Sequence, residues 1–134
     1  MKKSLKTEQC FYQSANFRNT SFVKSIRKEF GLKGYALIIA TLEEISRNGI
    51  SVCYDQSFCD RIISDFPEVS QNLLDMVVRK MVKSEFLDRE AFYKRKVLTP
   101  PERCIMDRIE DVWLTAHDET RPYLFFKKQS YDDN

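Results

Sequence analysis

The pattern of apolar and polar positions along the chain predicts several short helices. The clearest runs from Gly34 to Asn48, where apolar residues recur every three or four positions. The recurring residues are Leu37, Ile38, Thr41, Leu42 and Ile45. Glu43, Glu44 and Arg47 are expected on the opposite side of this helix. Asn48 and Gly49 are typical of a helix end.

Capping residues predict the other helices. Asn19 is expected to cap a helix that extends to Phe30, and Gly31 is expected to stop it. Asp55 and Ser70 are expected to cap two further helices, over about 55–63 and 70–83. A last helix is expected from a capping-box pair and two prolines at 99–102. Its apolar stripe would be Ile105, Ile109, Val112, Trp113 and Ala116.

Four short strands are predicted between and after these helices. Residues 50–54 alternate between apolar and polar, as a half-buried strand does. Residues 85–88 and 95–98 are expected to form two strands joined by an exposed hairpin loop at 89–94. Residues 122–126 are expected to form a closing strand.

The order of elements from 34 to 98 is typical of a winged helix. That fold is a helix-turn-helix extended by a β-hairpin, the wing. The predicted fold class is therefore α+β, mainly α. We expect one domain over 1–134, with a winged-helix core at about 34–99 and flanking elements at 9–30 and 100–127. The flanking elements are an N-terminal helix and a C-terminal helix and strand.

Composition narrows the class of protein. The chain has 134 residues and a net charge of only +2, so a nucleic-acid signal has to come from local clustering of charge. The cysteines, Cys10, Cys53, Cys59 and Cys104, form no closely spaced pairs, and His117 is the only histidine. This spacing argues against a metal site. The basic N-terminus lacks a following apolar segment, and no apolar run is long enough to span a bilayer, so a cytoplasmic protein without membrane contact is expected.

Catalytic motifs are absent from the sequence. There is no P-loop, no glycine-rich dinucleotide turn, no Gly-x-Ser-x-Gly and no His-Glu-x-x-His. Asp107, Glu110 and Asp111 lie close together, but Arg103 and Arg108 are interleaved with them, as in helix-surface ion pairs. We therefore expect no enzyme activity and no cofactor.

Two segments near the N-terminus resemble a family of winged-helix N-terminal domains. The family occurs on phage-type and mobile-element replication initiators and on DnaD-like primosome proteins. The resemblance rests on an aromatic-polar-Asn opening at 11–19 and a Gly-x-x-Gly-Tyr helix start at Gly31, Gly34 and Tyr35. Short sequence motifs that are also similar to the family lie at 86–88, where the chain enters the predicted wing, and at 97–99, where it leaves the wing. The family often has a second small residue and a Trp in the central helix, where this chain has Ala36, Ile39 and Ala40. The resemblance implies a winged helix in a replication or mobile-element context.

A DNA site is predicted on the helix at 70–83 and on the wing. In a winged helix the second helix of the pair enters the major groove and the wing reaches the neighbouring backbone. Clustered cations neutralise phosphate. Duplex DNA is expected as the ligand more than single-stranded DNA. The candidate DNA-binding residues are Ser70, Gln71, Asn72, Arg79, Lys80, Lys83, Arg89, Lys94, Arg95 and Lys96.

The alternative is a protein-interaction module that has the fold without the DNA contact. Acidic Asp75 and Glu90 lie among the candidate cations and would repel phosphate. The flanking segments at 19–30 and 113–126 are rich in aromatic residues, and such elements commonly build dimers. A homodimer is therefore a candidate partner beside DNA, and the resemblance implies replication proteins as further candidates.

Overall fold

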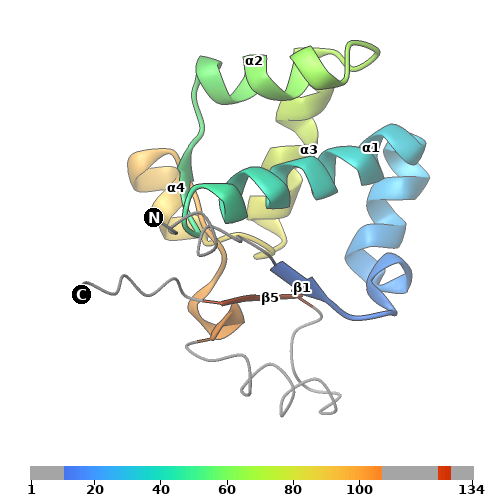
Figure 1. The fold of residues 1–134 in the computed structure, drawn as a ribbon. Helices are drawn as coiled ribbons and strands as arrows, with labels where there is room; N and C mark the ends of the chain where they lie inside the picture. The colour runs from blue at the N-terminus through green and yellow to red at the C-terminus, as the bar shows by residue number, and fades with distance from the viewer. Residues whose placement is uncertain (1–10, 107–123, 128–134) are drawn as a thin grey trace, which may run out of the picture.

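A computed structural model describes residues 11–106 and 124–127, which form a mainly helical α+β fold. Its helices are α1 (Ser21–Arg47), α2 (Gln56–Asp65), α3 (Gln71–Lys83) and α4 (Arg89–Arg95), with short 3-10 turns η2 (Phe17–Asn19) and η3 (Glu102–Cys104) (Figure 1). Its strands are β1 (Phe11–Gln13), β2 (Val52–Cys53), β3 (Val97–Leu98), β4 (Ile105–Met106) and β5 (Leu124–Lys127). The predicted class, α+β and mainly helical, is confirmed.

The two helices predicted on either side of Gly31 are confirmed: they are the two halves of α1, joined by a kink at Gly31. Gly31 has φ +73° and ψ −157°, a non-helical backbone conformation that essentially only glycine adopts, so it ends the first half of α1 as expected, and the second half follows it in a new direction. The N-cap is Thr20 and not Asn19: the Thr20 hydroxyl accepts from the Val23 N–H at 3.5 Å. The bend turns Phe22, Val23, Ile26 and Phe30 of the first half toward the same core that the second half contacts.

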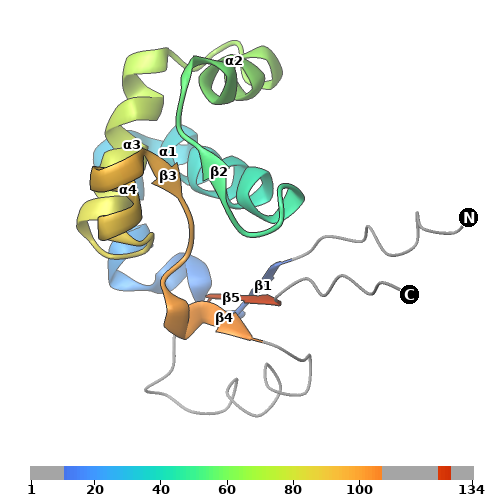
Figure 2. The same cartoon turned by 90° about the vertical axis from the view of Figure 1, so that its left-hand side faces the viewer.

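Helices α2 and α3 begin where the caps predict. Asp55 Oδ1 accepts from the Phe58 N–H at 2.9 Å, and the Ser70 hydroxyl accepts from the Leu73 N–H at 3.0 Å. Each helix presents one apolar side to the core, and α3 packs against α1. The buried side of α3 consists of Leu74, Val77, Val78, Met81 and Val82. Figure 2 shows α3 along the outer edge of the molecule, with the second half of α1 on its inner side.

The strand predicted at 50–54 is confirmed as β2, which pairs with β3 in a two-stranded antiparallel sheet. Val52 lies opposite Leu98, and Cys53 lies opposite Val97. The ladder is extended by the Tyr54 N–H, which donates to the Lys96 carbonyl at 2.8 Å. The second strand predicted for the wing, 95–98, is thus reduced to β3.

The predicted wing hairpin is wrong: residues 89–95 form α4. Asp88 caps this helix, because its Oδ2 accepts from the Ala91 N–H at 2.9 Å. Ala91 and Phe92 are buried against α3, which an exposed loop would not allow. Residues 85–88 form no strand; only the Asp88 N–H bonds across, to the Thr99 carbonyl at 2.8 Å. Lys96 then ends α4 in the left-handed conformation, with φ +53°.

Both ends of the described chain meet in a second sheet, ordered β1-β5-β4. Phe11 pairs antiparallel with Phe126, which also pairs parallel with Ile105. The predicted closing strand is confirmed, at Leu124–Lys127. The helix predicted from 99–102 does not start there: a single 3-10 turn is followed by β4, because Ile105 is held by the ladder to β5. Its remaining length, like Trp113, lies outside the described residues.

No helix in the described part of the chain is long and apolar enough to cross a membrane.

Candidate nucleic-acid interface

The outer side of α3 carries a row of exposed polar and basic residues. Asn72, Met76, Arg79 and Lys83 follow one another at helical spacing, opposite the buried apolar side, and all four are exposed. Met76 is 40% exposed, although it is apolar. We call these four residues the α3 face. Asp75 and Lys80, which flank it on either side, are half-buried.

Asp75 connects the α3 face to β2. The Tyr54 hydroxyl donates to Asp75 Oδ1 at 2.6 Å, and Arg79 Nε donates to Asp75 Oδ2 at 2.9 Å. Burial, followed by the bond to Asp75, raises the pKa of Tyr54 far above its usual range, so this hydroxyl remains a donor. Asp75 therefore orients the Arg79 guanidinium and offsets part of its charge.

Phe92 of α4 brings together two candidate cations that the sequence places on separate elements. The Phe92 ring is 1% exposed. Arg79 Cζ lies 5.4 Å and Lys96 Nζ lies 4.7 Å from its centroid, both within cation–π range. Tyr93, which is 60% exposed, packs edge-on against the same ring. The structure thus joins residues of α3 and of the predicted wing at one border of the α3 face.

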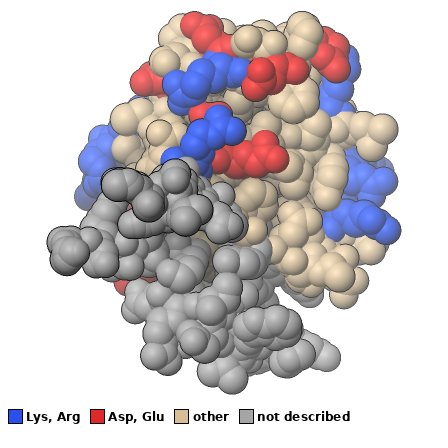
Figure 3. Space-filling view, viewed as in Figure 1, with Lys and Arg blue, Asp and Glu red and all other residues tan. Residues whose placement is uncertain are grey.

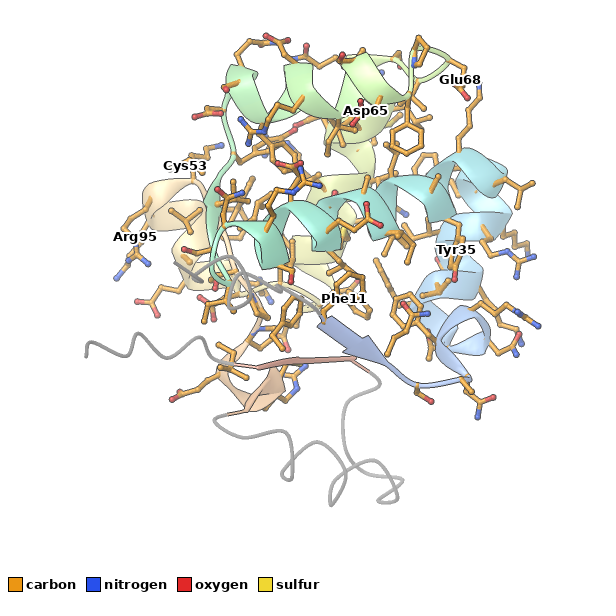
Figure 4. All side chains as sticks on the ribbon, in the orientation of Figure 1. Phe11, Tyr35, Cys53, Asp65, Glu68 and Arg95 are labelled. Carbon is orange, nitrogen blue, oxygen red and sulfur yellow. The ribbon has the colours of Figure 1, made fainter. Side chains whose placement is uncertain are left out.

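The other candidate cations of α4 are arranged differently. Arg89 at the start of α4 pairs with Glu85 of the preceding turn at 3.4 Å, and Lys94 pairs with Glu90 one helical turn earlier in α4 at 2.9 Å. Arg95 is exposed and points away from the body of the molecule (Figure 4). Because α4 replaces the hairpin, these cations follow a helix surface and do not extend outward on a wing.

Lys80 lies on the opposite flank of α3. Its Nζ pairs with Glu29 of α1 at 2.5 Å and lies 6.0 Å from the Phe30 ring centroid. Lys80 therefore fastens α3 to the first half of α1, and part of its charge is offset there.

The N-terminal end of α3 borders a surface hollow of about 540 Å³. Its lining residues are Tyr54, Asp55, Gln56, Cys59, Gln71, Asn72 and Asp75. Gln71 exchanges two amide hydrogen bonds with Gln56, at 2.9 and 3.2 Å, and the Ser70 hydroxyl is used as a cap. Two of the lining residues are carboxylates, so this hollow does not attract phosphate. Any phosphate contact of this surface has to come from its flanks.

A basic surface on the first half of α1 is missing from the site predicted by the sequence. Lys24, Arg27 and Lys28 are all exposed, and Lys and Arg side chains gather over this part of α1 at the right of Figure 3. The signal is present in the sequence, because residues 17–33 contain five cations and one acid. The apolar periodicity of this segment indicates only a helix that covers the core, so its charge does not enter the predicted site.

Metal and thiol chemistry find little support in the part of the chain that the structure covers. No group of three or more His, Cys, Asp or Glu residues is placed to hold a metal ion within residues 11–106 and 124–127. Burial raises the pKa of the Cys59 thiol, and it raises the pKa of Cys104 to about 11. Neither thiol is therefore a thiolate at neutral pH.

Residues 11–102 match the family described as Lin1244/Lin1753-like, N-terminal, and the chain belongs to this family. The description states no activity. No curated protein matches the chain, and no solved structure matches it.

Proposed function

We propose that this protein binds duplex DNA through the α3 face, with α4 in the position that the wing hairpin has in a winged helix. The observation that carries the proposal is the meeting of Arg79 and Lys96 at the Phe92 ring, directly beside the exposed row on α3. An exposed helix bordered by fixed cations suits a major groove bordered by phosphates. Under this proposal Asn72 reaches a base edge, since its amide can both donate and accept.

The order of elements supports the proposed relation to a winged helix. Helices α1, α2 and α3 are followed by α4 and then by β3, and β3 pairs with β2, which lies between α1 and α2 in the chain. In winged-helix proteins the helix that corresponds to α3 enters the groove. The replication or mobile-element context is proposed from the sequence resemblance alone, of which the Gly31, Gly34 and Tyr35 element is the most specific part. A homodimer under this proposal would present two α3 faces to two half-sites.

The second candidate is a protein-interaction module without DNA contact. It is favoured by the internal pairing of the candidate cations: Asp75, Glu85 and Glu90 each pair with one of them. Over residues 55–96, eight acids match eight bases. A surface of this kind suits a partner with mixed charges better than a polyanion.

Fluorescence anisotropy with a mixed-sequence duplex and the corresponding single strand, each at two salt concentrations, tests the proposal. We expect salt-sensitive binding that favours the duplex. Arg79→Ala and Lys96→Ala should each weaken it and lower the slope of log K against log salt by about 0.9 for each phosphate that is no longer neutralised. Arg47→Ala is the control, because it removes one exposed cation at the end of α1; thermal unfolding checks that the variant stays folded without the pair to Glu44. No duplex binding at low salt would favour the interaction module.

A further inference from the structure

We propose that Lys24, Arg27 and Lys28, which we call the α1 basic face, form a second phosphate contact on the opposite side of α3 from α4. This inference rests on the proposed DNA binding by the α3 face. It names the backbone of the same duplex as the ligand.

The charge of the described chain is distributed unevenly. Residues 17–33 contain Arg18, Lys24, Arg27, Lys28 and Lys33 against a single acid, Glu29. Residues 55–96, which include the whole of α2, α3 and α4, have no net charge. The attraction for a polyanion is therefore strongest on the first half of α1.

The cations of the α1 basic face point outward because their helix is anchored on its other side. Val23 and Ile26 are fully buried, and at helical spacing this leaves Lys24, Arg27 and Lys28 toward solvent. Glu29, the one acid nearby in the sequence, is already paired with Lys80. The charges of the three cations are thus not offset by that acid.

Two sets of contacts place the first half of α1 and α4 on opposite flanks of α3. Lys80, on one flank, pairs with Glu29 and so holds the first half of α1 there. Asp75 and Arg79, toward the other flank, contact Tyr54 and Phe92. Figure 1 shows the same arrangement, with α4 and the first half of α1 to either side of α3. A duplex on the α3 face would therefore have α4 on one side and the first half of α1, which carries the exposed cations, on the other.

The kink in α1 fixes the position of the α1 basic face. Gly34 lies so close to the first half that an added Cβ would be 2.8 Å from Ile26 Cγ2 and from Phe30 Cβ. The two halves of α1 are packed against each other, so the backbone that carries the cations is held in place before a ligand binds. Such preorganisation lowers the ordering cost of binding.

The test compares three forms of the full chain in the duplex titration. Lys24→Gln/Arg27→Gln/Lys28→Gln should weaken binding and lower the salt slope by about 2 to 3, one phosphate for each cation. Lys24→Arg/Arg27→Lys/Lys28→Arg is the matched control, because it keeps all three charges and should bind as the unsubstituted protein does. Circular dichroism and thermal unfolding check that both variants are folded.

The outcomes separate this inference from the proposed function. If Arg79→Ala weakens binding but the glutamine variant binds with unchanged affinity and slope, the α1 contact is overturned and the α3 site remains. If the glutamine variant loses affinity while Arg79→Ala and Lys96→Ala do not, the α3 site is overturned, and with it the flanking role of α1. Loss of affinity in both sets supports the inference. Absence of duplex binding by the unsubstituted protein overturns both.

Discussion

Gly34 in the second half of α1 packs directly against Ile26 in the first half. A Cβ added at Gly34 would lie 2.8 Å from Ile26 Cγ2 and 3.3 Å from the Ile26 carbonyl oxygen. Gly31, between them, has the φ of +73° that allows the chain to return on itself. The Gly-x-x-Gly element therefore has two separate physical roles: Gly31 makes the bend, and Gly34 allows the two halves to touch.

Gly34→Ala should destabilise the protein, although alanine is the better helix former. The gain in helix propensity is about 1 kcal/mol. The steric conflict involves Phe30 Cβ and backbone atoms that cannot rotate away, and overpacking of this kind costs about 1–3 kcal/mol. Urea unfolding followed by circular dichroism measures the net loss. Ser25→Ala, at an exposed position in the same helix, is the control, and an equal or higher unfolding midpoint for Gly34→Ala would contradict this packing.

Gly31→Ala should destabilise for a different reason. Nothing lies within 4 Å of a Cβ added at Gly31, so the effect is purely one of backbone conformation. Holding alanine at φ +73° and ψ −157° should cost about 1–3 kcal/mol of the free energy of unfolding. The same urea titration measures it. A stabilised Gly31→Ala variant would mean that α1 can straighten.

Glu44 links α1 to α2, and its neutralisation should destabilise the fold. Its side chain is only 9% exposed and accepts from Arg47 at 3.1 Å and from Arg61 at 2.9 Å. Glu44→Gln keeps the shape but loses the negative charge, and its amide nitrogen cannot accept from an arginine, which should lower the free energy of unfolding by about 1–3 kcal/mol. Glu43→Gln, at the exposed neighbouring position, should change it by less than about 0.5 kcal/mol. Equal effects of the two substitutions would exclude the proposed link.

The features that the sequence predicts correctly depend on neighbours within a few residues. The caps at Asp55 and Ser70 each bond to an N–H three residues later, and both helices begin where expected. The outward direction of Asn72 and Lys83 follows from the periodicity of α3 alone. Local patterns determine such features, so a single sequence suffices.

The features that the sequence does not predict depend on contacts with residues far along the chain. Glu44 is expected on the polar side of its helix but is buried, because Arg61 of α2 pairs with it. The helix expected after Pro101 is interrupted, because Ile105 pairs with Phe126. At the candidate site, α4 replaces the wing because Phe92 is buried against α3. The residues next to Phe92 in the sequence do not indicate this burial.

Thiol labelling should distinguish Cys53 from the other described cysteines. Cys53 is exposed, whereas Cys59 and Cys104 are buried and their pKa values are raised by that burial. In a Cys10→Ser background at pH 8, iodoacetamide should modify one thiol rapidly and all three only after unfolding in urea. Mass spectrometry of the digested protein assigns the sites. Labelling of Cys104 as fast as that of Cys53 would contradict the burial of η3.

Stability should fall at alkaline pH, and Tyr54 should be a main cause. An unfolded tyrosine loses its proton near pH 10, whereas folding holds the pKa of Tyr54 well above that value. Above pH 10 the unfolded state therefore binds fewer protons than the folded state, and the free energy of unfolding decreases as pH rises. Below about pH 9 the full contribution of Tyr54 to the free energy of unfolding is present. The pKa of Cys104 is about 11 in the folded protein against 9.0 when unfolded, so Cys104 adds a further loss of stability as the pH rises between these two values.

Urea unfolding of the unsubstituted protein, Tyr54→Phe and Tyr93→Phe at pH 8 to 11 resolves the contribution of Tyr54. Tyr54→Phe should be less stable at pH 8, by about 1 kcal/mol for the missing bond to Asp75, but should lose less stability on going to pH 11. Tyr93 is exposed, so Tyr93→Phe should keep the full alkaline loss. If Tyr54→Phe and the unsubstituted protein declined in parallel, the Tyr54 hydroxyl would not be held protonated by folding, and the link from β2 through Asp75 to Arg79 would lose its support.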